Sequence, residues 1–260
     1  MYIKPYDELT IQDNFIFQKV MRNKRICKQT IERLLDIDIK DISYPEEEKS
    51  INVRLDSKSI RLDVYVNDDK GTVFNIEMQT TKDMDELVKR ARYYQGLIDI
   101  DNIEKGQNYS ALHDTYIIFI CTFGVFTGKR HKYTFRNLCI EDSEILLNDG
   151  TTKLFLSTKG EADDVSKPLK MFLDYVDGKK PEDALMQEID HEVDTVKHCD
   201  EWRRDYMTLA LEMDKKWREG KAEGKIEAIR NAIKDGLTTL AAVKKSGRYT
   251  EEEIAAIAAP

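Results

Sequence analysis

The chain has 260 residues, enough for one sizeable domain with a smaller appendage or for two small domains. Hydrophobic residues make up 41% of it and charged residues 35%, a composition that excludes general disorder. The net charge of −8 gives no support of its own to a nucleic-acid partner. Four widely spaced cysteines without a CxxC pair argue against a zinc site and against a disulfide framework.

The first part of the chain is predicted to form a helix followed by a β-hairpin. Apolar residues recur near helical spacing between residues 8 and 36, which predicts a helix there. Alternation of apolar and polar residues predicts strands at 51–55 and 60–66. The sequence NDDKG at 67–71 is typical of a tight turn, and another strand is predicted at 73–79. The strands on either side of this turn should pair as a hairpin.

Beyond the hairpin, the pattern predicts one helix, three strands and then helices. Helical spacing marks residues 83–98, and the nearly unbroken apolar run TYIIFICTF at 115–123 predicts a central strand buried on both faces. Shorter strands are predicted near 132–140 and 151–157. From about residue 165 onward the pattern is helical.

Two acids stand inside the predicted hairpin. Asp63 lies between Leu62 and Val64, and Glu77 lies between Ile76 and Met78. If the arms pair antiparallel, the two carboxylates can converge, and nearby carboxylates repel unless a cation lies between them. Mg²⁺ in such a place could support hydrolysis of a phosphodiester. The alternative is a polar, solvent-facing side of the hairpin with two ordinary carboxylates.

Three stretches of the chain resemble a known nuclease superfamily: IRLDVYVNDDKGTVFNIEMQ, RARYYQGLI and DTYIIFICTF. They look like the PD-(D/E)XK nucleases, and within them the recombination-promoting nucleases (Rpn) associated with transposases. The resemblance covers residues 5 to about 240 and is strongest over 10–125. It implies an α/β fold, a restriction-endonuclease-like αβββαβ core, and the activity of a metal-dependent DNA endonuclease.

The resemblance also implies roles for residues of the hairpin. Asp63 and Glu77 match the two acids of the motif and would bind Mg²⁺ (or Mn²⁺), while Met78 would offer a backbone carbonyl to the metal. Gln79 stands where the superfamily usually has lysine. A neutral amide can orient the attacking water but contributes no charge, so Gln79 departs from the usual chemistry.

Three residues outside the hairpin are further candidates. Asp13 resembles an N-terminal acid of the family and would be an active-site neighbour; the alternatives are a helix cap or a surface acid. Arg90 and Tyr94 are four positions apart and so share a helix face, which in this fold often borders the phosphate-binding cleft. Both are therefore predicted to contact DNA, against the alternatives of ion pairing for Arg90 and core packing for Tyr94.

The expected domains are a PD-(D/E)XK nuclease-like core at 1–160, a helical extension at 161–217 and a small basic helical tail at 218–260. An apolar stripe near the start of the C-terminal helices needs a partner surface, which can be a second subunit or the chain's own core. The stripe consists of Trp202, Tyr206, Leu209, Met213 and Trp217.

The sequence thus predicts an enzyme that cuts DNA, with a homodimer as a further possible partnership. The alternative is a catalytically inactive DNA-binding or assembly protein on the same scaffold, which the missing lysine favours. RNA is a third substrate option, because metal-assisted hydrolysis does not itself select the sugar. The N-terminus has no basic segment followed by an apolar one, and no run of 18 apolar residues occurs, so a cytoplasmic protein without a membrane partner is expected.

Overall fold

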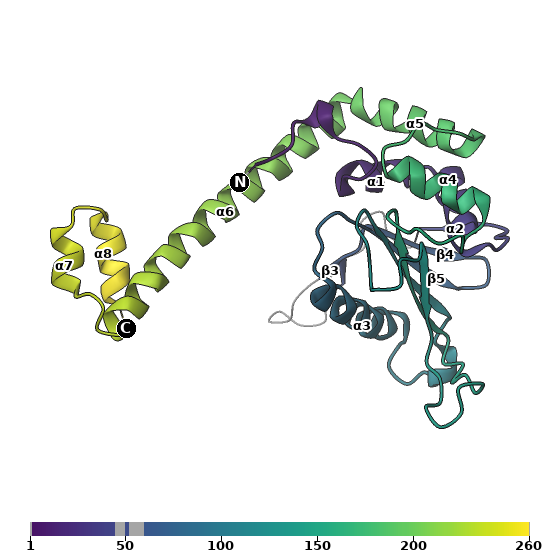
Figure 1. Cartoon of the computed structure of the whole chain (residues 1–260), viewed down its shortest axis with the longest axis horizontal. Coiled ribbons are helices and arrows are strands. Elements are labelled where there is room, and N and C mark those ends of the chain that lie inside the picture. The colour runs from purple at the N-terminus through teal and green to yellow at the C-terminus, as the bar shows by residue number, and fades with distance from the viewer. Residues whose placement is uncertain (1, 45–49, 52–59, 260) are drawn as a thin grey trace. The chain divides into compact units, whose positions relative to one another are not determined.

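The computed structural model describes residues 2–44, 50–51 and 60–259. They form two compact units, one of residues 7–199 and one that joins residues 1–6 to residues 200–260 (Figure 1). The chain therefore divides near residue 200, because the first helices after residue 160 pack against the N-terminal helices of the larger unit. The expected domains at 1–160, 161–217 and 218–260 stay a prediction.

The larger unit is built on a six-stranded mixed sheet with the strand order β1-β4-β5-β6-β8-β7. The strands are β1 (Ile42–Ser43), β4 (Val64–Asp68), β5 (Val73–Gln79), β6 (Thr115–Cys121), β7 (Lys132–Phe135) and β8 (Thr151–Ser157). β5 runs parallel to β6 and β6 to β8, whereas the remaining neighbours pair antiparallel. The predicted α/β class, with a core of helix, three strands, helix and strand, is confirmed.

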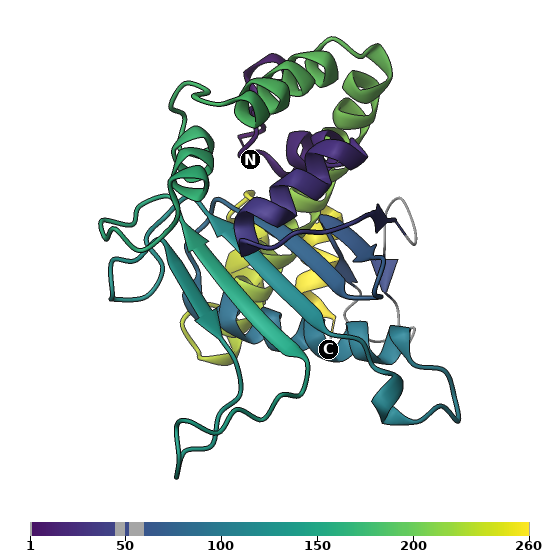
Figure 2. The ribbon, with the colours of Figure 1, turned by 90° about the vertical axis from the view of Figure 1, so that its right-hand side faces the viewer.

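Helices cover both faces of this sheet (Figures 1 and 2). On one face lies α3 (Met84–Asn102), which packs its buried residues on a cluster that includes Ile117, Phe119 and Phe155 of the sheet. The helices of the other face are α1 (Asn14–Val20), α2 (Lys24–Leu35), α4 (Lys167–Val176) and α5 (Ala184–Lys197). β5 and β6 are buried between the two layers, which explains their apolar sequences.

Two predicted elements are shorter than expected. The single helix predicted over 8–36 is a short 3₁₀ turn, η1 (Tyr6–Glu8), followed by α1 and α2. The break falls at Asn23, whose side chain accepts a hydrogen bond from the Ile26 N–H (3.4 Å) and so caps a new helix. The strand predicted near 132–140 ends at Phe135, and beyond it Leu138 makes an isolated bridge to Leu146.

The strand predicted over 60–66 is interrupted at residues 62–63. Its first part, β3 (Ile60–Arg61), pairs with β2 (Ser50–Ile51) in a separate two-stranded sheet, and β4 begins only at Val64. Leu62 therefore packs with Tyr65 in the cluster under α3. Most of the strand predicted at 51–55 lies outside the described residues.

The smaller unit contains α6 (Asp200–Lys234), α7 (Leu240–Lys245) and α8 (Glu251–Ala258). α8 begins with a capping box between Thr250 and Glu253 and is tied to α6 by an ion pair from Lys225 to Glu253 (3.0 Å). The helical pattern expected from about residue 165 onward is confirmed. In the part of the chain that the structure describes, no helix combines the length and the apolar character that a membrane span requires.

Candidate active site

The hairpin of β4 and β5 sets the positions of the two candidate acids. Its register pairs Val64 with Ile76. Continuing this register by one residue places Asp63, just ahead of β4, opposite Glu77 in β5. The interruption of the strand before β4 leaves Asp63 in a bend, where its side chain is free of the alternation that governs a regular strand.

The two acids and their neighbours form one hydrogen-bonded group. The backbone N–H of Asp63 donates to Glu77 Oε1 (3.2 Å), and the backbone N–H of Met78 donates to Asp63 Oδ2 (3.1 Å). The other carboxylate oxygen, Asp63 Oδ1, accepts a hydrogen bond from Gln18 Nε2 of α1 (2.8 Å). The structure thus places the two acids in one hydrogen-bonded group, and their binding of a metal ion stays a prediction.

Glu77 is held in an apolar setting that disfavours its charge. Its side chain is only 3% exposed, and the buried amide of Asn75 can donate to both Glu77 Oε1 and Val64 O (3.3 Å each). Burial raises the pKa of Glu77 well above its ordinary value, and the neighbouring Asp63 charge raises it further. The Arg90 charge opposes both effects. The pair is thus an electrostatically unfavourable arrangement unless a positive charge joins it.

Replacing Glu77 with glutamine is expected to stabilise the metal-free protein above acid pH. The pKa of Glu77 is higher in the folded than in the unfolded protein, so neutral Glu77 contributes its full stability to the fold below the ordinary pKa of 4.5. This contribution is lost as the pH rises through the folded-state pKa, because the buried side chain must then carry a charge. Thermal melts in EDTA should show a gain for Glu77→Gln near pH 8 and little difference near pH 4. The exposed Glu104→Gln is the control, and an equal gain at both pH values would contradict the expectation.

The oxygen atoms at this position suit a hard divalent cation. Two carboxylates approach each other, and the Met78 carbonyl points to the same side of β5 as the Met78 N–H that contacts Asp63. Among the described residues, no group of three or more His, Cys, Asp or Glu side chains could hold a metal. Mg²⁺ commonly uses one or two carboxylates and completes its coordination with water and substrate phosphates, so a two-acid site fits it.

Gln79 ends β5 and lies two residues beyond Glu77, on the same face of the sheet. Its backbone is fixed because the Gln79 carbonyl accepts hydrogen bonds from the Thr122 N–H (3.0 Å) and Oγ1 (3.4 Å). Its side chain is half-buried, in contrast to Glu77. The structure therefore places Gln79 beside the acids at the more open end of the strand.

The two predicted DNA contacts on α3 differ from each other. The Arg90 guanidinium lies 5.4 Å from the centre of the Phe119 ring and 5.8 Å from that of Tyr94. Its Nε and Nη2 atoms are buried and have no hydrogen-bond partner among the described residues. Tyr94 is only 6% exposed, and burial, followed by the Glu77 charge, raises its pKa. Tyr94 thus packs in the core, the alternative to DNA contact, whereas Arg90 faces the site with unsatisfied donors.

Asp13 and Gln18 lie in the N-terminal segment, and only Gln18 contacts one of the two acids directly among the hydrogen bonds described. Asp13 accepts hydrogen bonds from the Thr10 N–H (2.7 Å) and Oγ1 (3.3 Å), so its carboxylate closes the turn ahead of α1. Its place near a metal stays a prediction. Gln18 contacts Asp63 directly and was missed, because a polar residue on an amphipathic helix carries no spacing motif that marks a site.

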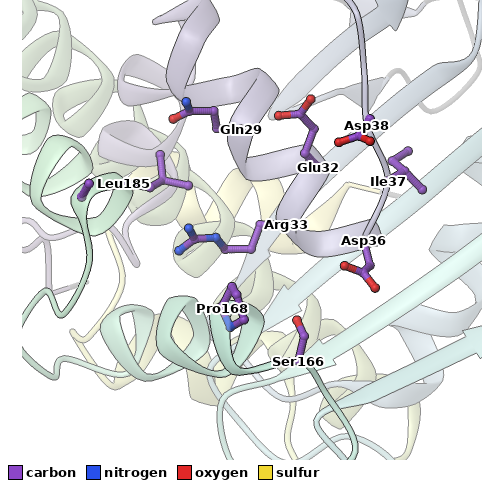
Figure 3. A pocket seen from close by; sticks show the side chains of 10 residues that line it. Gln29, Glu32, Arg33, Asp36, Ile37, Asp38, Ser166, Pro168 and Leu185 are labelled. Carbon is purple, nitrogen blue, oxygen red and sulfur yellow. The ribbon is translucent and has the colours of Figure 1, made fainter.

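A cavity of about 800 Å³ lies apart from the two acids, between α2 and the starts of α4 and α5 (Figure 3). Several of its polar side chains already have partners. Arg33 Nη1 pairs with Asp183 (2.6 Å), and Glu32 Oε1 accepts hydrogen bonds from Lys28 Nζ (2.8 Å) and the Ile39 N–H (2.9 Å). We assign no chemistry to this cavity.

Comparison with known families agrees with the geometry of the site. The family model of a PD-(D/E)XK nuclease family transposase matches residues 14–159, more than half of the chain, and spans both acids, Gln79 and Arg90. No curated protein and no solved structure matches the chain. PD-(D/E)XK nucleases generally use divalent metal ions. The resemblance found in the sequence is confirmed, and the chain belongs to the PD-(D/E)XK nuclease family transposases.

Proposed function

We propose that this protein is a divalent-metal-dependent endonuclease that hydrolyses phosphodiester bonds in DNA. The observation that carries the proposal is the convergence of Asp63 and Glu77 within one hydrogen-bonded group next to Arg90. Burial and repulsion by Asp63 raise the pKa of Glu77, which means that the charged pair is unfavourable for the fold. If the pair had only a structural role, an uncharged residue in place of one acid would make the folded protein more stable. Binding of a cation between them explains why both carboxylates are present.

Each residue has a distinct role in this proposal. Asp63 and Glu77 would hold Mg²⁺ or Mn²⁺ together with the Met78 carbonyl, and the ion would supply Lewis-acid polarisation of the phosphate and of the attacking water. Gln79 orients that water through its amide. Arg90 lies beside Glu77, where its positive charge would favour the ionised carboxylate that holds the ion. Gln18 positions Asp63 through its hydrogen bond.

One observation favours a second candidate function. Gln79 supplies no positive charge where the superfamily usually has lysine, which fits a catalytically inactive DNA-binding or assembly protein. The two functions differ in whether the bound phosphodiester is cut.

Incubation with supercoiled plasmid separates these candidates. We expect the purified chain to nick or linearise plasmid in Mg²⁺ or Mn²⁺ and to leave it intact in EDTA. Binding without cleavage in all three conditions would support the inactive scaffold. A parallel incubation with a structured RNA determines whether the activity selects DNA.

We expect the protein to form a homodimer through α6. Along the whole of α6, Asp200–Lys234, no residue is buried, and Met213 of the predicted stripe is 40% exposed. Twofold pairing would present one active site to each strand of a duplex. Met213→Glu would place two like charges in the interface, so light scattering at micromolar concentration should show a monomer.

The matched control for this dimer is Leu211→Glu. Leu211 is 72% exposed and lies two positions from Met213, hence on roughly the opposite side of the helix. This variant should remain dimeric. A monomeric wild type, or an equal effect of both substitutions, would contradict the proposed interface.

A further inference from the structure

A group of aromatic side chains reaches the surface at the β7 edge of the sheet. The centre of the Phe126 ring lies 5.0 Å from that of Tyr133, 5.1 Å from that of Phe135 and 5.4 Å from that of Phe155. Phe126 is 38% exposed and Phe135 is 43% exposed, although both are large apolar residues. We call these two residues the aromatic ledge. Their exposed ring surface has no role in the core.

The aromatic ledge is connected to the candidate active site by the sheet itself. Glu77 pairs with Phe119, Phe119 with Phe155 and Phe155 with Tyr133 across four neighbouring strands. Such neighbours point to the same face of a sheet, and three strand spacings amount to about 14 Å. The Phe119 and Phe155 rings stack with their centres 5.3 Å apart. The ledge thus lies on the same face as Glu77, on the far side of the buried Phe119 and Phe155 rings that α3 covers, at a distance that one bound polynucleotide can span.

The loop that presents the ledge is fixed in place. Tyr133 Oη accepts a hydrogen bond from the Arg130 N–H (2.9 Å), and the Lys129 carbonyl accepts one from the Glu161 N–H (2.8 Å). Phe126 and Lys129 both adopt left-handed backbone conformations (φ of 50° and 52°), which residues other than glycine rarely adopt. A residue other than glycine with positive φ is strained, and it stays in this conformation only where surrounding contacts enforce it. Such strained residues are common at binding sites.

Cations accompany the aromatic rings. Lys129 and Arg130 are exposed and lie in a stretch, residues 122–140, that contains no Asp or Glu. Lys129 pairs with Glu161 (2.8 Å), and Arg130 lies 3.8 Å from Asp164. The Lys129–Glu161 pair is exposed on both sides, and such pairs contribute little stability, so a phosphate group can compete for Lys129.

We propose that the aromatic ledge stacks with unpaired nucleotide bases while Lys129 and Arg130 contact the adjoining phosphates. The inference rests on the proposed function and narrows its substrate to nucleic acid that has a single-stranded segment beside the cleavage point. Base stacking on exposed aromatic rings next to cations is the general mode of single-strand binding. Inside a duplex the faces of each base are covered by the neighbouring base pairs, and therefore cannot stack on the ledge.

Fluorescence anisotropy in EDTA tests the inference without cleavage. The probes are a labelled single-stranded oligonucleotide and a blunt duplex of the same sequence. Phe135→Leu keeps an apolar side chain but removes the ring, so it should weaken single-strand binding by about 5- to 150-fold, the range for loss of one stacked base. Phe135→Trp should retain the affinity, and Ile140→Ala, at an exposed apolar site outside the ledge, should not change it.

The phosphate contacts have a separate signature. Lys129→Ala should weaken binding and reduce the slope of log affinity against log salt by about 0.7, the value for one phosphate on a single strand. Phe135→Leu should leave that slope unchanged, because stacking releases no counterions. A change of slope in both variants would overturn the division of roles between ring and cation.

The outcomes separate this inference from the proposed function. If the wild type cuts plasmid but Phe135→Leu binds single strands as tightly as the wild type, the ledge inference fails and the nuclease stands. If no condition gives cleavage but Phe135→Leu loses single-strand affinity, the ledge stands and the nuclease fails. A Phe135→Leu variant that changes oligomeric state without losing oligonucleotide affinity would make the ledge a protein interface and overturn the inference.

Discussion

Asp63→Asn is expected to abolish metal-dependent cleavage of plasmid DNA. The variant keeps the size of the side chain but removes a charged metal ligand, and several kcal/mol of charge stabilisation would be lost. Since each 1.4 kcal/mol is a factor of ten, the rate should fall roughly 10³-fold or more. Gln18 can turn its amide to accept from the new Asn amide, so the hydrogen bond to α1 survives. Nicking assays at matched protein concentration measure the loss.

The control for this substitution is Asp69→Asn, at an exposed acid in the turn of the same hairpin. It should cleave like the wild type, and thermal melting should show that both variants are folded. Equal cleavage by wild type and Asp63→Asn would mean that the activity comes from a contaminant or from another site.

Gln79→Ala is expected to slow cleavage by about 10²- to 10⁴-fold, the range for a group that handles water or a proton in the transition state. Metal binding should remain, because Gln79 supplies none of the proposed ligands. Gln79→Lys should retain activity, since it introduces the residue usual in the superfamily. Single-turnover rates measured at saturating Mn²⁺ separate these effects from metal affinity.

A different result for Gln79 would change the mechanism. If Gln79→Ala cleaves at the wild-type rate, the water is oriented by another group. If Gln79→Lys raises the rate far above that of the wild type, the native glutamine marks a weakened enzyme, which would favour the inactive scaffold as the native function.

The hairpin could be predicted from the sequence because its information is local. Period-two alternation and the NDDKG turn fix which residues pair, and the pairing places Asp63 opposite Glu77. The boundaries of β5 coincide with the predicted strand at 73–79. The apolar run at 115–123 likewise contains β6, since strands buried on both faces are continuously apolar.

The supporting residues could not be predicted because their contacts are not local. Gln18 reaches Asp63 from a helix 45 positions earlier in the chain. Tyr94 and Arg90 share a helix face and both lie over the Phe119 ring of the sheet, where two buried Arg90 donors have no hydrogen-bond partner among the described residues. Helical spacing states which residues lie together but not which of them the sheet covers. The break at Asn23 was missed for a related reason, because apolar spacing continues across the cap.

Titration with Mn²⁺ by calorimetry, without DNA, tests the central claim that Asp63 and Glu77 together hold a divalent metal ion. The wild type should bind Mn²⁺, and Asp63→Asn and Glu77→Gln should each weaken that binding by more than the 10- to 100-fold typical of losing only a supporting partner. The Asp69→Asn control should bind like the wild type. Wild-type protein that binds no Mn²⁺, or variants that bind it as tightly as the wild type, would contradict the account.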